Sequence, residues 1–148
     1  MQGFASIEHV VVYRNQGAFC GWPFNGGMWQ FADGELALGF VRGRCDYATP
    51  RSVSHRAVDM EQGEHLIIRS RDGGRTWPED SLSLVYRRPE FDERTRNAPY
   101  ADPGGERRDP RADGFCLIAG YGIPPREDRT NLFVIVSTDR GRSWSEPV

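Results

Sequence analysis

Short runs of apolar residues, separated by turns rich in Gly, Asp and Pro, organise most of this chain. Runs of this length between such turns are typical of β-strands, and no segment shows the longer periodicity of an amphipathic helix. The runs that we expect to form strands are 9–13, 28–31, 36–41, 65–69, 82–86, 115–121 and 131–136. The pattern therefore predicts an all-β protein of antiparallel strands.

The spacing of the runs also predicts how some of them pair. Asp33-Gly34 separates the runs 28–31 and 36–41, and Asp-Gly favours a tight turn between antiparallel strands. A loop from 42 to 63 leads to the next two runs, so that 26–87 would form one four-stranded antiparallel sheet. The stretch 88–111 mixes Arg with acidic residues and Pro, which predicts an exposed loop.

Two octapeptides share the pattern Ser-x-Asp-x-Gly-x-Thr/Ser-Trp, and each follows an apolar run. Asp accepts hydrogen bonds from backbone N–H groups of its own turn, Gly supplies a positive φ, and Trp buries a large ring. A strand, a special turn and a Trp that occur twice indicate a repeat architecture. The specified positions are Ser70, Asp72, Gly74, Thr76 and Trp77 in the first octapeptide, and Ser137, Asp139, Gly141, Ser143 and Trp144 in the second.

The octapeptides resemble the Asp box, or BNR repeat, of the sialidase (neuraminidase) superfamily, and the chain resembles the N-terminal part of a divergent bacterial sialidase-like protein. The resemblance implies a six-bladed β-propeller of four-stranded antiparallel blades, with about two blades present in 1–148. Residues 1–14 would supply a ring-closing strand, 26–87 the first blade and 112–148 an incomplete second blade that stops where its fourth strand should start. In that family the box stabilises the blade away from the catalytic face, so we expect Asp72 and Asp139 to be structural.

The same resemblance implies an exo-α-sialidase type of activity, the hydrolysis of terminal sialic acid from glycans. The family holds the substrate carboxylate with three arginines, because guanidinium groups stay charged and bind carboxylates in a bidentate way. A Tyr activated by a Glu is its nucleophile, and an Asp is its acid/base. The first of the three arginines is expected two residues before Pro23, where this chain has Gly21.

The candidate site residues lie between the second expected strand and the first box, and in the loop before Trp29. Asp46 and Asp59 are the candidates for the acid/base. Arg42 and Arg44 are candidates for binding the substrate carboxylate, and Trp22, in a Gly- and Pro-rich loop, for stacking on a sugar ring. The alternative for both Asp and both Arg residues is a solvated loop. The remaining catalytic groups would come from further blades.

Two classes of function therefore stay open. The first is a sialidase-like glycoside hydrolase that needs further blades for activity and has a sialoside or another glycan as its partner. The second is a non-catalytic Asp-box module that binds a glycan or a protein, which the absence of Arg at position 21 favours. A truncated product without independent function is a third alternative. Open sheet edges would allow self-association.

Composition narrows the chemistry. The net charge is −2 and points to no nucleic acid, and the absence of Lys excludes Schiff-base and P-loop mechanisms. Cys20, Cys45 and Cys116 have no C-x-x-C spacing, so we expect no metal site, and no cofactor; a Cys20–Cys45 disulfide stays open. No apolar stretch is long enough to span a membrane, and the N-terminus lacks the pattern of a signal peptide. The compartment stays unknown.

Overall fold

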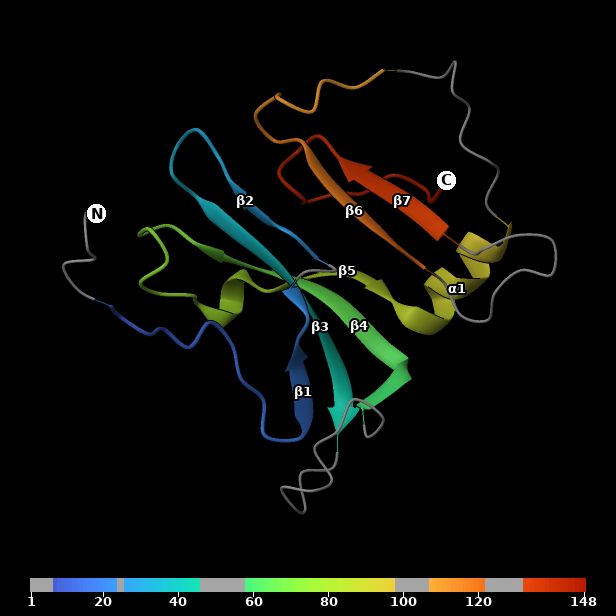
Figure 1. Cartoon of the computed structure of the whole chain (residues 1–148), viewed down its shortest axis with the longest axis horizontal. Helices are drawn as coiled ribbons and strands as arrows, with labels where there is room; N and C mark the ends of the chain where they lie inside the picture. Colours follow the sequence, from blue (N-terminus) through green and yellow to red (C-terminus); the bar gives the residue numbers. More distant parts are fainter. Residues whose placement is uncertain (1–6, 24–25, 46–57, 98–106, 122–131) are drawn as a thin grey trace, which may run out of the picture.

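The computed structural model describes residues 7–23, 26–45, 58–97, 107–121 and 132–148. They form mostly β-structure, in two antiparallel sheets with one α-helix beside them (Figure 1). The all-β prediction is confirmed at this level. The elements are β1 (Ala18–Gly21), β2 (Met28–Gln30), β3 (Leu36–Cys45), β4 (Val58–Ser70), the 3-10 helix η3 (Glu79–Ser81), β5 (Ser83–Arg87), α1 (Arg88–Asn97), β6 (Cys116–Tyr121) and β7 (Leu132–Ser137).

The first sheet has the strand order β1-β3-β4-β5, and β2 also pairs with β3. Because β1 faces residues 41–44 of β3 and β2 faces residues 36–38, the two strands share one edge as an interrupted outer strand. At the interruption the backbones of Gly26 and Gly39 approach so closely that a Cβ on either would clash with the other. The Gly39 N–H donates to the Gly27 carbonyl at 2.9 Å, so the sheet pairing resumes without side chains between the strands.

The expected strands of this sheet are present, but two of them are longer than the apolar runs. β4 contains the expected run 65–69, whereas β2 covers 28–30 of the run 28–31 and β5 covers 83–86 of the run 82–86. The hairpin at Asp33-Gly34 is confirmed by a Gly34 N–H to Phe31 carbonyl bond of 2.9 Å. The expected loop over 42–63 is wrong at both ends, because 42–45 belong to β3 and 58–63 to β4. Charged cross-strand pairs stabilise this extension, which an apolar pattern does not reveal.

The expected strand at 9–13 is also wrong, because these residues lie outside both sheets. They cover one face of the first sheet instead: the Tyr13 ring lies 5.2 Å from that of Phe40, and Val12 packs on the same cluster. Conversely, β1 forms in a Gly- and aromatic-rich stretch with no strand pattern. Tertiary pairing with β3 decides its conformation.

Both faces of the first sheet are covered. Leu66 and Ile68 of β4 pack with Phe40 on one face, under the N-terminal segment. Ile67 points to the other face and packs with Cys116 of the second sheet, both with no exposed surface. This double coverage explains why Leu66, Ile67 and Ile68 are consecutive apolar residues rather than an alternating pattern.

The second sheet pairs β6 with β7, and the segment after the second box adds to the free edge of β7. The Ser145 N–H donates to the Val136 carbonyl at 2.9 Å, and the Val134 N–H donates to the Val148 carbonyl at 2.9 Å. The strand that we expected to start at the end of the chain therefore already pairs with β7 from Ser145 onward.

The expected exposed loop over 88–111 is wrong for Arg88–Asn97, which form α1. Pro89 suits the first turn of a helix, where its missing N–H removes no hydrogen bond. Phe91 is buried against both sheets, with its ring 4.1 Å from Tyr86 and 4.8 Å from Phe133. The rest of the helix is largely polar, so its amphipathic pattern is weak; Thr95 is also buried, and Arg94 forms an ion pair with Glu146 at 2.9 Å. Residues 98–106 lie outside the described residues, and 107–111 are exposed.

The first octapeptide forms a turn closed by its own side chains, between β4 and η3. Gly74 donates its N–H to Ser70 Oγ at 2.9 Å, and Thr76 donates its N–H and hydroxyl to the two Asp72 oxygens at 2.9 and 2.7 Å. The Trp77 indole donates to the Gly74 carbonyl at 2.9 Å. Gly74 has φ 89°, the positive value that its place in the motif predicts.

The second octapeptide repeats this network after β7. Gly141 donates to Ser137 Oγ at 2.8 Å, and Ser143 donates its N–H and hydroxyl to Asp139 at 2.9 and 2.6 Å. Partial burial acts to raise the pKa of Asp139, but the hydrogen bonds from Ser143 outweigh it and hold this pKa at about 2. Trp144 instead packs into the core between the sheets, with its ring 6.2 Å from Trp29.

We predict that Asp139→Ala lowers the free energy of unfolding by about 2 kcal/mol, because it removes charge-assisted hydrogen bonds that close the second turn. Asp109→Ala is the control, because Asp109 is exposed and its carboxylate accepts the N–H of the neighbouring Arg111 at 2.9 Å. Urea denaturation of both variants measures the difference. Equal stability of the two variants would contradict a stabilising role of the turn.

The buried His65 predicts a loss of stability in mild acid. His65 is 1% exposed, with Nδ1 3.0 Å from the Tyr86 hydroxyl, and burial and the charge of Arg88 lower its pKa to about 4. The unfolded chain takes up this proton near pH 6.5 and the folded one only near pH 4, so stability falls as pH drops between these values, by about 3 kcal/mol in full.

Denaturation curves at several pH values measure this loss. His65→Phe should remove most of the slope between pH 6.5 and 4, whereas His9→Gln, at an exposed histidine, should keep it. The same slope in all three proteins would show that other groups cause it.

Candidate functional site

Three of the sequence-predicted site residues lie at one end of the first sheet, remote from the first box. β3 begins with Leu36 opposite Ser70 of the box and ends with Cys45 opposite Val58 (Figure 1). Arg42, Arg44 and Asp59 all belong to the second of these ends. Leu36 and Arg42 are six positions apart along the strand, which corresponds to roughly 20 Å. The structure thus places the candidate binding residues and the first Asp box at opposite ends of one sheet.

Arg42 is the centre of a hydrogen-bonded group that we call the Arg42 cluster: Tyr13, Arg42, Glu64 and Arg87. Its Nε and Nη2 donate to one Glu64 oxygen at 2.9 and 2.6 Å, and its Nη1 donates to the Tyr13 hydroxyl at 3.0 Å. The other Glu64 oxygen accepts from Arg87 Nε at 3.3 Å. Two cations thus share one carboxylate, which leaves the cluster with a net positive charge.

The register of the sheet builds this cluster. Glu64 of the central strand β4 lies opposite Arg42 on one neighbouring strand and opposite Arg87 on the other. Partial burial acts to lower the pKa of Arg42, but its hydrogen bonds to Glu64 and Tyr13 outweigh burial and raise this pKa. The guanidinium is therefore charged, held in position and still 30% exposed.

Arg44 and Asp59 face each other across the ladder beyond a bulge. Arg42 pairs with Glu64 but Arg44 pairs with Asp59, so β4 has extra residues between the two pairs. The Asp59 carboxylate accepts the Glu61 N–H at 3.1 Å and thereby stabilises the bulge. Both Arg44 and Asp59 are exposed, as their solvated-loop alternative also implied. Asp46 lies outside the described residues.

Trp22 lies between β1 and β2, with φ 55° and its ring 4.5 Å from that of Phe19. It is half-buried in this contact, so its ring is not a free platform for a sugar. A small apolar cavity of about 200 Å³ lies nearby. Tyr13 of the Arg42 cluster and Pro23, the neighbour of Trp22, both line it.

Sequence analysis missed Tyr13, Glu64 and Arg87 as neighbours of Arg42. They are far apart in the sequence, and no motif links them. Glu64 and Arg87 could have been predicted as neighbours only from the strand register, which places Glu64 opposite Arg42 and Arg87 opposite Glu64. The position of Tyr13 depends on a segment that is not part of any sheet.

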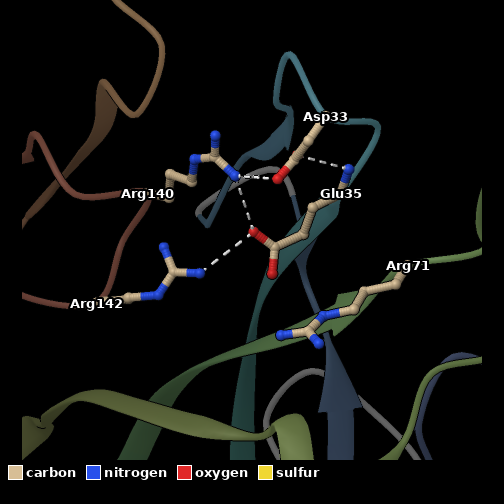
Figure 2. Close-up of a pocket in the computed structure, with 5 residues that line it drawn as sticks. All are labelled: Asp33, Glu35, Arg71, Arg140 and Arg142. Atoms are coloured by element: carbon tan, nitrogen blue, oxygen red, sulfur yellow. Dashed lines mark hydrogen bonds and ion pairs between the residues drawn. The ribbon is translucent and has the colours of Figure 1, made fainter.

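A second charged group, which sequence analysis also missed, lies between the two sheets at the Asp-box end. We call it the Glu35 cluster: Asp33, Glu35, Arg69, Asp113, Arg140 and Arg142. Figure 2 shows Arg140 and Arg142 of the second box directed at Asp33 and Glu35 of the β2–β3 turn. Arg140 bonds Asp33 and Asp113 at 2.5 and 2.6 Å, and one Glu35 oxygen lies 3.4 Å from Arg142.

This cluster joins the sheets. Asp33 and Glu35 lie in the turn between β2 and β3 of the first sheet, whereas Arg140 and Arg142 lie in the turn that follows β7 of the second sheet. Hydrogen bonds from Arg140 lower the pKa of Asp33, and those to Asp33 and Asp113 raise the pKa of Arg140. Arg69, in β4 of the first sheet, adds another contact between the sheets, since its Nη2 donates to the Arg140 carbonyl at 2.7 Å.

Comparisons of the chain with protein-family models, with curated proteins and with solved structures found no match.

Three further findings on the described residues bear on the chemistry of the chain. They contain no group of three His, Cys, Asp or Glu side chains that could hold a metal ion. Cys20, Cys45 and Cys116 are free thiols, so the Cys20–Cys45 disulfide is not formed. Across the same residues, no helix is long and apolar enough to cross a membrane.

We predict that Arg140→Gly is more stable than Arg140→Ala by about 1 kcal/mol. Both variants lose the ion pairs to Asp33 and Asp113. Arg140 has φ 66°, a conformation that costs a residue with a Cβ about this much and costs Gly little. Paired urea denaturation measures the difference. A more stable Ala variant would show that the backbone of the turn changes when the ion pairs are lost.

Proposed function

We propose that this chain is part of a sialidase-like Asp-box β-propeller and that its partner is a glycan ending in sialic acid. The observation that carries the proposal is the pair of octapeptides, which close into the same hydrogen-bonded turn at the ends of β4 and β7. A repeated turn of this kind supports a repeated sheet unit. The first sheet has five antiparallel strands in four positions, because β1 and β2 share one edge, and four positions match the strand number of one propeller blade.

The substrate-binding part of the proposal rests on the charge at the far end of this sheet. Arg44 is exposed, and Arg42 is charged and held by Glu64 beside it. An exposed guanidinium next to a cluster of net positive charge favours a carboxylate ligand. In this proposal Arg44 binds the sialic acid carboxylate, Arg42 strengthens the local positive potential, and Asp59 or Asp46 is the acid/base. Further blades supply the rest of the catalytic set.

A second candidate function is glycan or protein binding without catalysis. One observation favours it: the Nε and both Nη atoms of Arg42 already donate to Glu64 or Tyr13, so this arginine is less free to hold a substrate than its place in the sequence suggested. Gly21, at the position where the sialidase family has an arginine, also favours binding without catalysis. The hydrolase and a glycan-binding module both expect a bound sialoside and differ in turnover, whereas a protein-binding module expects no bound sialoside.

We predict that the chain binds sialyllactose and not lactose, and that Arg44→Ala weakens this binding about tenfold, as expected for a lost charged hydrogen bond. Arg111→Ala is the matched control, because Arg111 is exposed and lies in another segment. Titration followed by NMR measures the affinities. Equal binding of lactose, or no effect of Arg44→Ala, would contradict the carboxylate site.

Hydrolysis of a fluorogenic sialoside separates the two candidates. Turnover by the propeller that contains this chain, lost in Asp59→Asn or in Asp46→Asn, supports the hydrolase. Binding without turnover supports the non-catalytic module. Turnover that survives both substitutions would show that the acid lies elsewhere.

A further inference from the structure

The Glu35 cluster leaves two buried polar atoms without a hydrogen bond from or to any described residue: Glu35 Oε1 and Arg69 Nη1. The Glu35 side chain is only 6% exposed, and its other oxygen, Oε2, faces Arg142, Arg140 and Arg69 at 3.4, 3.7 and 3.8 Å. Figure 2 shows the free oxygen of Glu35 directed into the space between Arg142 and Arg71. Buried polar atoms of a native protein are normally paired, so these two indicate a missing group.

The chemistry of the two atoms defines that group. Glu35 Oε1 can only accept a hydrogen bond when ionised, and Arg69 Nη1 can only donate one. A hydroxyl satisfies both at once, because it donates to the carboxylate and accepts from the guanidinium. A simple anion, which has no hydrogen to donate, leaves Glu35 Oε1 unpaired.

Arg71 supplies a second feature. It is exposed, lines the same pocket, and forms no hydrogen bond or ion pair with the residues that the structure describes (Figure 2). A guanidinium in this state is a ready partner for a carboxylate, which it binds with two parallel hydrogen bonds. Arg142, half-exposed on the other side of the opening, adds positive charge.

The space around these residues is large enough for a small ligand. The pocket between Asp33, Glu35, Arg71, Arg140 and Arg142 has a volume of about 190 Å³. A wider groove of about 550 Å³ shares Glu35, Arg71 and Arg142 with it and continues past Thr76 and Ser81. Arg69 also lines this groove, whereas the Thr76 and Ser81 hydroxyls already donate to Asp72 and Pro78.

We propose that this pocket and the adjoining groove bind an acidic sugar residue, with its carboxylate on Arg71 and one hydroxyl between Glu35, which lines both spaces, and Arg69, which lines the groove. The site lies at the Asp-box end of the first sheet and on the face toward the second sheet, whereas Arg42 and Phe40 lie on the other face near the other end. It is therefore separate from the site proposed at Arg44, and it does not depend on hydrolysis there.

The test is an NMR titration of the whole chain with glucuronate, following the backbone amides of Gly73, Gly74 and Gly141. Two ligands serve as controls: acetate carries the carboxylate without hydroxyls, and glucose carries hydroxyls without the carboxylate. We expect saturable shifts with glucuronate, and binding about tenfold weaker or more with either control, because each lacks one of the two groups.

Three variants test whether glucuronate binds in this pocket. Arg71→Ala should weaken glucuronate binding about tenfold, and its exposed position means that the fold should tolerate the change. Arg111→Ala and Arg44→Ala should have no effect, which separates this pocket from the proposed sialoside site. The absence of saturable shifts, equal binding of acetate and glucuronate, or an unchanged affinity in Arg71→Ala would each overturn the proposal, and water alone would then occupy the pocket.

Discussion

The acceptance of backbone N–H groups by a single Asp carboxylate is the interaction on which most of this structure depends. In each octapeptide the carboxylate takes a backbone and a side-chain donor from the residue four positions later. This closes the turn and sets where the following Trp and the intervening arginines point. In the second turn it also allows the positive φ of Arg140, which directs its side chain to the first sheet. The turn thus controls both local structure and the contact between the sheets.

The two sheets meet through an apolar centre with a charged rim. Ile67 and Cys116 are buried at the centre, and Arg140 bridges Asp33 and Asp113 at the rim. Apolar burial supplies most of the free energy of such a contact, because the net gain from partly buried ion pairs is small. The ion pairs instead fix the relative position of the sheets, since a shift of either sheet would separate Glu35 from Arg140 and Arg142.

Strand β3 connects the two charged groups of the molecule. It starts next to Glu35, whose carboxylate faces the second sheet, and it carries Arg42 near its other end on the face covered by Tyr13. The alternation of side chains along a strand puts these residues on different faces, and the length of the strand keeps them apart. One strand therefore separates the two sites that we propose, at Arg44 and at Glu35.

The sequence by itself determined the antiparallel β-class, most strand positions and the two turns, because each depends on neighbours within about eight residues. The Asp33-Gly34 hairpin and the hydrogen bonds of Asp72 and Asp139 are local in this sense. A helix held mainly by Phe91, and a strand β1 without a strand pattern, were missed because tertiary contacts fix both. Only the tertiary structure decided which charges meet. Glu64 lies between Arg42 and Arg87, and Glu35 among arginines of two sheets, because strand register and sheet packing bring together residues that are distant in the sequence.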